Sequence, residues 1–119
     1  MKVSGIDATY YTVKDLNGET KFYTGLLGGE PTFHQPDFVS EWTFGGGETF
    51  GLYQGAPENV TPGGTAMFAV GDVAQAVKDA QSIGAKMHEN GDVTDTPVCH
   101  MAFGEDPEGN QFILHKRKQ

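Results

Sequence analysis

The chain has 119 residues, of which 37% are hydrophobic and 20% charged. This length suits a single domain over residues 1–119, and the apolar content excludes a disordered chain. Sixteen acidic against eight basic residues give a formal charge of −8, which disfavours nucleic-acid or membrane binding and favours a cationic ligand. A single cysteine, Cys99, and the lack of a signal-peptide core or a membrane-spanning apolar run predict a cytoplasmic protein.

The first half starts with alternating residues in ATYYTV (8–13), which predict a strand. Asp15 then stands where a helix N-cap is expected, so a helix should begin near Leu16 and run to the glycine after Leu27. Three short strands follow, broken by turn residues: PTFHQ (31–35), FVSEWTF (38–44) and ETFGLYQ (48–54).

The second half repeats this order after a Gly- and Pro-rich linker over about residues 54–64. TAMFAV predicts a strand from Thr65, and Asp72 predicts the N-cap of a helix that starts near Val73 and stops at Gly84. The later strands are AKMHE (85–89), VCHMAFG (98–104) and NQFILHK (110–116), with a DPEGN turn before the last.

Two βαβββ half-domains, over about residues 3–55 and 63–116, are the simplest interpretation of this repeat. The predicted fold class is therefore α+β, with the two halves forming a curved mixed sheet around a cleft and the helices outside.

The motifs KFYTGLLGGEP (21–31) and EDPEGNQFILH (105–115), together with the repeat, resemble the vicinal oxygen chelate superfamily. That superfamily includes glyoxalase I, extradiol dioxygenases and bleomycin-binding proteins. The resemblance implies a cleft that, in the metalloenzymes, holds a divalent ion with four side chains. Two of those side chains come from the first strands of the halves and two from the last strands.

The residues at these four positions are not usual metal ligands: Ala8, Thr65, Gly51 and Ile113. Three of them have no donor atom in the side chain, whereas a divalent ion needs several oxygen or nitrogen donors. The sequence therefore predicts no metal and no cofactor in the cleft. His34, His88 and His100, with His115, leave open a metal site of a different kind. A Cys99–His100 dyad is excluded because strand neighbours point to opposite faces.

The alternation of side chains along each strand predicts which residues face the cleft. Tyr10 and Tyr53 share faces with Ala8 and Gly51, so both should line it and leave a volume that a ligand occupies. The full set of predicted cleft residues is Ala8, Tyr10, Thr12, Trp42, Gly51, Tyr53, Thr65, Met67, Ile113 and His115. For Trp42, Phe38 and Phe44, covering the open sheet or a dimer contact is an equal alternative.

The predicted function is the binding or sequestration of a small aromatic or cationic molecule by a homodimer, as in metal-free bleomycin-type proteins. The alternative is an enzyme of the glyoxalase, lyase or dioxygenase type, with or without a metal. In that case Tyr10, Thr65 or His115 would do acid–base work, although no pair among them identifies a reaction. A purely structural subunit is the third possibility.

Overall fold

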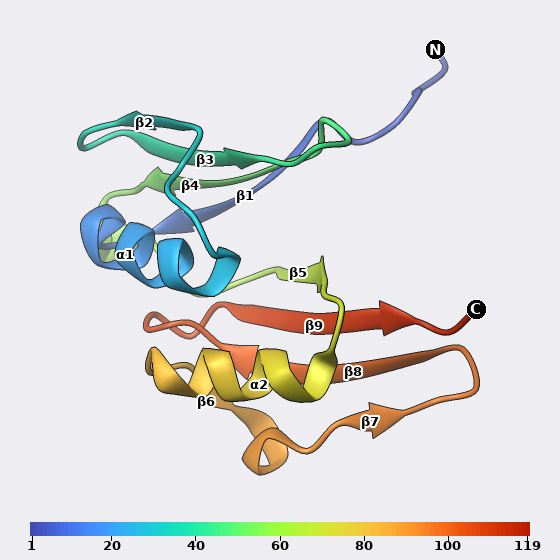
Figure 1. Cartoon of the computed structure of the whole chain (residues 1–119). Coiled ribbons are helices and arrows are strands. Elements are labelled where there is room, and N and C mark those ends of the chain that lie inside the picture. The colour runs from blue at the N-terminus through green and yellow to red at the C-terminus, as the bar shows by residue number, and fades with distance from the viewer.

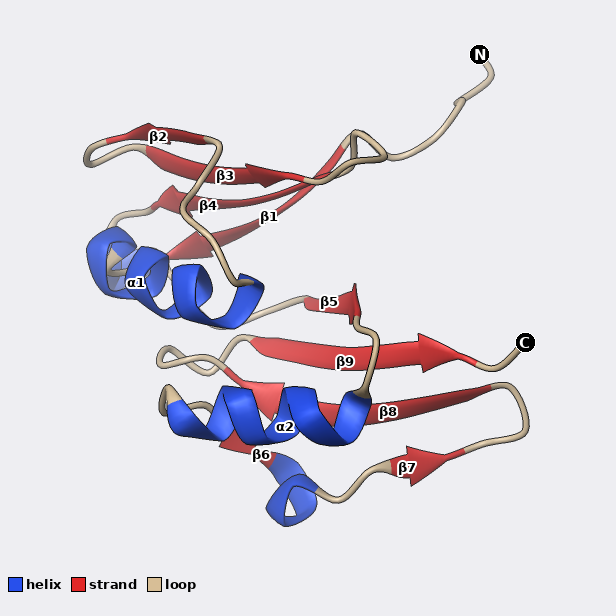
Figure 2. Cartoon of the chain, viewed as in Figure 1, coloured by secondary structure: helices blue, strands red, loops and turns tan.

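Two mixed sheets, each with one helix, make up the computed structural model, which describes all of residues 1–119 (Figures 1 and 2). The first half contains β1 (Ala8–Val13), α1 (Leu16–Leu27), β2 (Phe33–Gln35), β3 (Val39–Thr43) and β4 (Thr49–Gln54). The linker forms a short 3-10 helix, η1 (Pro57–Asn59). The second half contains β5 (Thr65–Ala69), α2 (Val73–Ser82), β6 (Lys86–Met87), η2 (His88–Gly91), β7 (Thr94–Asp95), β8 (Cys99–Glu105) and β9 (Gln111–Arg117).

The two sheets repeat one topology, which confirms the α+β fold class. The strand order is β1-β4-β3-β2 in the first and β5-β9-β8-β6 in the second, where β7 also pairs with β8. In each half the first strand runs parallel to the last, and the remaining pairs are antiparallel. Neither helix is long and apolar enough to cross a membrane.

Both predicted helix starts are confirmed. The Asp15 carboxylate accepts a hydrogen bond from the Gly18 amide, and Asp72 accepts one from Gln75, each at 3.1 Å. The first helix ends at Gly28, whose φ of 83° is the left-handed conformation that glycine adopts most easily.

The third predicted element of the second half is shorter than expected. AKMHE was predicted as one strand, but β6 stops at Met87 and the chain turns into η2. Glu89 and Asn90 have left-handed φ values of 52° and 56°, which no strand accommodates. The extra pairing of β7 with β8 follows from this turn.

One hydrophobic core joins the two halves, built from the side chains that face the helices. Its largest members include Tyr23, Phe50 and Phe112, and the ring of Phe50 lies 5.1 Å from that of Phe68 in the second half. Figure 1 shows α1 on the side of the first sheet that faces the second half. The opposite face of the first sheet is open.

The motifs KFYTGLLGGEP (21–31) and EDPEGNQFILH (105–115) meet where the two halves of the chain contact each other. The Tyr23 hydroxyl donates to the Asp106 carboxylate at 2.8 Å, which connects FY of the first half with DPEGN of the second. The Glu108 carboxylate of the same turn accepts hydrogen bonds from the backbone amides of Lys14 and Asp15 at 2.7 and 2.8 Å. The turn between β8 and β9 therefore holds the start of α1.

Candidate functional site

The open face of the first sheet carries a cluster of aromatic rings around one carboxylate. Tyr10 of β1 and Tyr53 of β4 lie with their ring centroids 4.6 Å apart, and the Phe38 ring is 5.6 Å from Tyr53. The Tyr10 hydroxyl donates to the Glu41 carboxylate of β3. The pairing register explains this arrangement, because Gly51 stands opposite both Tyr10 and Glu41.

Gly51 makes room for the Tyr10 ring. A Cβ atom at Gly51 would stand 2.2 Å from the Tyr10 ring, closer than any side chain tolerates. The expectation of an empty volume beside Gly51 is therefore wrong, because the Tyr10 side chain folds over the glycine and fills it. The aromatic surface that a ligand meets is the outer side of that ring.

Hydrogen bonding raises the pKa of the Tyr10 phenol. The bond to Glu41 brings this pKa to about 12, and burial and the Glu41 charge add to the shift. At neutral pH the hydroxyl is a hydrogen-bond donor, and its bond to Glu41 orients both side chains.

Trp42 does not belong to this face, and its prediction as a cleft residue is wrong. Its side chain is only 4% exposed, and its indole N–H donates to the Gly29 carbonyl at 2.9 Å. Its ring lies 6.3 Å from Tyr23 and 6.1 Å from Phe50, inside the core. Neighbours on a strand face opposite ways, so burial of Trp42 places Glu41 on the open face.

Glu41 was missed by sequence reasoning. The signal that could have found it is the alternation along FVSEWTF, where assigning Trp42 to the core would have placed Glu41 beside Gly51. Phe33 of β2 pairs with Glu41 and is 52% exposed, so a further aromatic side chain borders the carboxylate.

The remaining predicted residues occupy the open face of the second sheet. Met67 of β5 pairs with Ile113 of β9, which in turn pairs with Phe103 of β8. His115 pairs with Met101 on the same face. Met67 is 53% exposed, and the other four are half-buried. The middle of this face is therefore apolar, with one imidazole, and the polar residues Thr65, Gln111 and Glu105 lie toward one end of it.

The predicted cleft residues form two groups within one chain and do not line one cavity. Ala8, Tyr10, Thr12, Gly51 and Tyr53 belong to the first sheet, and Thr65, Met67, Ile113 and His115 to the second. The open face of the first sheet points away from the second half (Figure 1). A pocket of about 330 Å³ lies at the end of α1 and includes only Met67 of the predicted set.

The four positions of the family's metal ligands do not fit a divalent ion. Ala8, Gly51 and Ile113 supply no donor, and they lie with Thr65 on two different sheets. No group of three or more His, Cys, Asp or Glu side chains is arranged to hold a metal ion.

The histidines are dispersed, and three of them have partners of other kinds. His34 bonds the Ser40 hydroxyl at 2.8 Å, and His88 bonds the Glu105 carboxylate at 2.8 Å. His100 lies 3.5 Å from Asp95.

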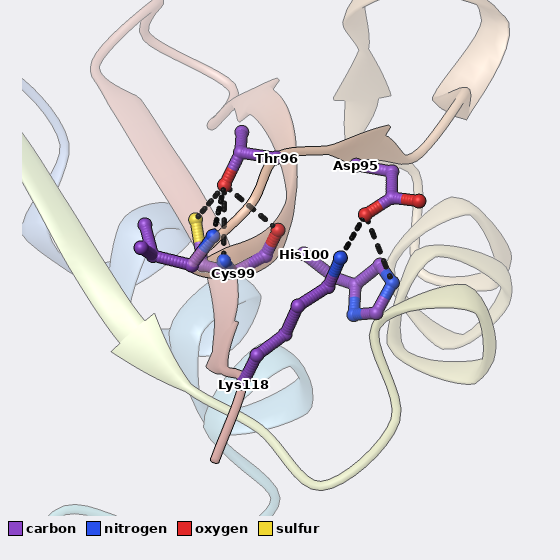
Figure 3. A network of polar contacts seen from close by, with 6 residues as sticks. Asp95, Thr96, Cys99, His100 and Lys118 are labelled. Carbon is purple, nitrogen blue, oxygen red and sulfur yellow. Dashed lines mark hydrogen bonds and ion pairs between the residues drawn. The ribbon is translucent and has the colours of Figure 1, made fainter.

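Cys99 and His100 have separate surroundings. Figure 3 shows the buried Cys99 thiol directed toward Thr96, at 3.2 Å from its hydroxyl, and His100 directed toward Asp95. Lys118 also bonds Asp95 and lowers the pKa of that carboxyl. This network attaches the C-terminal segment to the β7–β8 hairpin. The Cys99 thiol is not in contact with the His100 imidazole, so the two do not form a nucleophile–base pair.

Comparison with known proteins places the chain in a family. The profile of the glyoxalase-like domain matches residues 8–115. The chain belongs to the glyoxalase-like domain family. It is thereby a member of the vicinal oxygen chelate superfamily, as the motifs and repeat had indicated. A search of the curated proteins finds no match.

Solved structures share the fold of this glyoxalase-like chain. A glyoxalase/bleomycin resistance protein from Albidiferax ferrireducens T118 superposes with a TM-score of 0.80 at 22% identity, over 95% of this chain and 98% of that one. A glyoxalase/bleomycin resistance protein/dioxygenase family enzyme from Burkholderia phytofirmans PsJN gives a TM-score of 0.76 at 19% identity, over 92% and 96%. At these identities the likeness establishes the fold alone.

Proposed function

We propose that this glyoxalase-like protein binds a small cationic or aromatic molecule, without a metal, on the open face of its first sheet. The observation that carries the proposal is the Glu41 carboxylate among the rings of Tyr10, Tyr53 and Phe33. Glu41 forms none of the chain's three ion pairs. Its charge is therefore available to a ligand.

The chemistry of this cluster suits an organic ammonium ion with an apolar body. Aromatic rings attract a cation through their negative faces, with about 0.5 to 2 kcal/mol per contact. The carboxylate adds a charge partner, and the net charge of −8 draws cations toward the molecule. Bleomycin resistance in the names of structural neighbours agrees with binding as a function.

Binding has more support than catalysis. The pKa of Tyr10, raised to about 12, makes its phenol a poorer acid–base catalyst at neutral pH than an ordinary tyrosine. The four family ligand positions lack the donors of a metalloenzyme.

We also propose that the binding protein is a homodimer with a shared ligand site. In a two-fold dimer, the open face of the first sheet of one subunit meets the apolar face of the partner's second sheet, and this contact occurs twice. Met67 and Ile113 would then cover the ligand bound by Tyr10. The buried free thiol of Cys99 suits a reducing cytoplasm, where we place the dimer.

The test is titration with benzyltrimethylammonium, followed by calorimetry and by NMR of the backbone amides. In the wild type we expect saturable shifts at Gly51 and Tyr53. Glu41→Gln should weaken the affinity roughly 2- to 30-fold, which corresponds to one cation contact. Tyr10→Ala should weaken it about tenfold.

The matched control is Glu48→Gln, which removes a carboxylate from the β3–β4 hairpin beside the 330 Å³ pocket. It should bind as the wild type does. Benzyl alcohol serves as a neutral comparison and should bind more weakly than the ammonium ion. Equal affinity in the wild type and Glu41→Gln, or shifts confined to residues away from the first sheet, would refute the proposal.

A further inference from the structure

Glu19 is a buried carboxyl group without a partner. It lies in α1, is only 1% exposed, and neither of its oxygens has a hydrogen bond. An ionised carboxylate in such surroundings would cost several kcal/mol in lost hydration. The side chain is therefore held in the core as a neutral, protonated acid.

The second buried carboxyl group, Asp106, has many partners. The Asp106 carboxylate, 4% exposed, accepts hydrogen bonds from the Tyr23 hydroxyl at 2.8 Å and from the amides of Glu108 and Asn110, both at 2.9 Å. The Asn110 side chain donates a further bond at 3.1 Å. These donors are already engaged by Asp106, and none of them reaches Glu19.

No positive charge offsets the two acids. Burial raises the pKa of Glu19 to about 10, and the negative charges of Asp106, Glu108 and Asp15 add to the shift. The hydroxyls that face this region stay protonated over the same range, because burial raises the pKa of Tyr11 to about 12 and also raises that of Tyr23.

We propose that Glu19 is buried in the folded protein as a neutral acid, and that its proton keeps α1 of the first half seated on the β8–β9 turn of the second. The turn carries the other links between the halves: Glu108 binds the Lys14 and Asp15 amides, and Asn110 accepts a hydrogen bond from the Gly63 amide at 3.1 Å. Without the proton, an unpaired negative charge lies in the core and the contact opens.

The direction of the pH effect follows from linkage. The folded-state pKa of Glu19 lies above its unfolded value of 4.5, so folding takes up a proton at neutral pH. The stability that this group contributes is fully present below pH 4.5 and is lost progressively as the pH rises toward about 10. Glu19→Gln keeps the size and the neutral state of the side chain and needs no proton.

Urea unfolding of the full chain between about pH 6 and 9 tests the buried proton of Glu19. The unfolding equilibrium constant of the wild type, divided by that of Glu19→Gln, should rise about tenfold per pH unit. At neutral pH the variant should be the more stable protein. Glu30→Gln, which changes an exposed glutamate after α1, should follow the wild type. A ratio that stays constant with pH overturns the proposal.

Two further measurements separate the proton from its effect on the interface. Infrared spectra at about pH 8 should contain the C=O stretch of a protonated carboxylic acid in the wild type and lose it in Glu19→Gln. The hydrogen-exchange protection factors of the Lys14, Asp15 and Gly63 amides should fall with rising pH in the wild type alone. Absence of the infrared band refutes the protonated state of Glu19. Protection factors that do not change refute its role in seating the helix.

Discussion

At the scale of single residues, the candidate site depends on its smallest residue, Gly51. Gly51 allows the Tyr10 ring to lie across β4, and from there its hydroxyl reaches Glu41. The position that would hold a metal ligand in a metalloenzyme relative thus supports an exposed aromatic side chain in this chain. A residue that looks like a loss of function in the sequence has a packing role in the structure.

This dependence predicts a coupled effect of Gly51→Ala and Tyr10→Ala. The new Cβ atom must displace the Tyr10 ring, so Gly51→Ala should cost about 1 kcal/mol more in the wild type than in the Tyr10→Ala background. A double-mutant cycle by urea unfolding measures the coupling. Without the ring, alanine should suit the strand as well as or better than glycine. A coupling energy near zero would mean that Tyr10 does not rest on Gly51 in solution.

At the scale of elements, the start of α1 is held by side chains from both halves. Asp15 caps the Gly18 amide, Gln54 of β4 accepts from the Leu16 amide at 2.9 Å, and Glu108 accepts from the Lys14 and Asp15 amides. By contrast, α2 has its N-cap Asp72 alone among side chains. The first helix is therefore coupled to the second half, while the second is capped locally.

Glu108→Ala should accordingly destabilise the protein by about 1 to 2 kcal/mol, because two amides at a helix start lose a charged acceptor. Chemical denaturation at neutral pH gives this difference. Glu58→Ala, which removes an exposed glutamate from η1, should leave the stability within about 0.5 kcal/mol of the wild type. Equal stability of the two variants would contradict the capping role of Glu108.

At the scale of the whole molecule, the chain has two open sheet faces with different chemistry. The first is aromatic and acidic, and the second is apolar in its middle, with Met67 and Ile113. They lie on different sides of the fold, so one chain does not close a site around a ligand (Figure 1). The proposed homodimer would cover both faces and close the site, since each open face would lie against the other in the partner.

We therefore expect light scattering at tens of micromolar to give twice the chain mass of 12.8 kDa. Met67→Glu places a charge in the proposed interface and should yield a folded monomer with weakened ligand binding. Val98→Glu, at a 70% exposed position in the β7–β8 turn, should remain dimeric. A wild type that scatters as a monomer would rule out the shared site.

The sequence by itself determined the repeat, the helix starts and the assignment of most strand residues to a face. Asp15 and Asp72 act through hydrogen bonds to amides three residues away, and alternation along a strand needs no knowledge of its partners. These are local effects, so the positions of Tyr10, Gly51 and Ile113 on the open faces followed from neighbours in the chain.

Only the tertiary structure decided which of Glu41 and Trp42 joins the site, what fills the space at Gly51, and that Glu19 is buried beside Asp106. Each of these depends on segments far apart in the chain. They are the pairing register of β3 on β4, the approach of the Tyr10 ring to Gly51, and the packing of α1 on the β8–β9 turn. Contacts of this kind are set by how the two halves bury a common core, and that burial is a property of the assembled fold and not of any one stretch of residues.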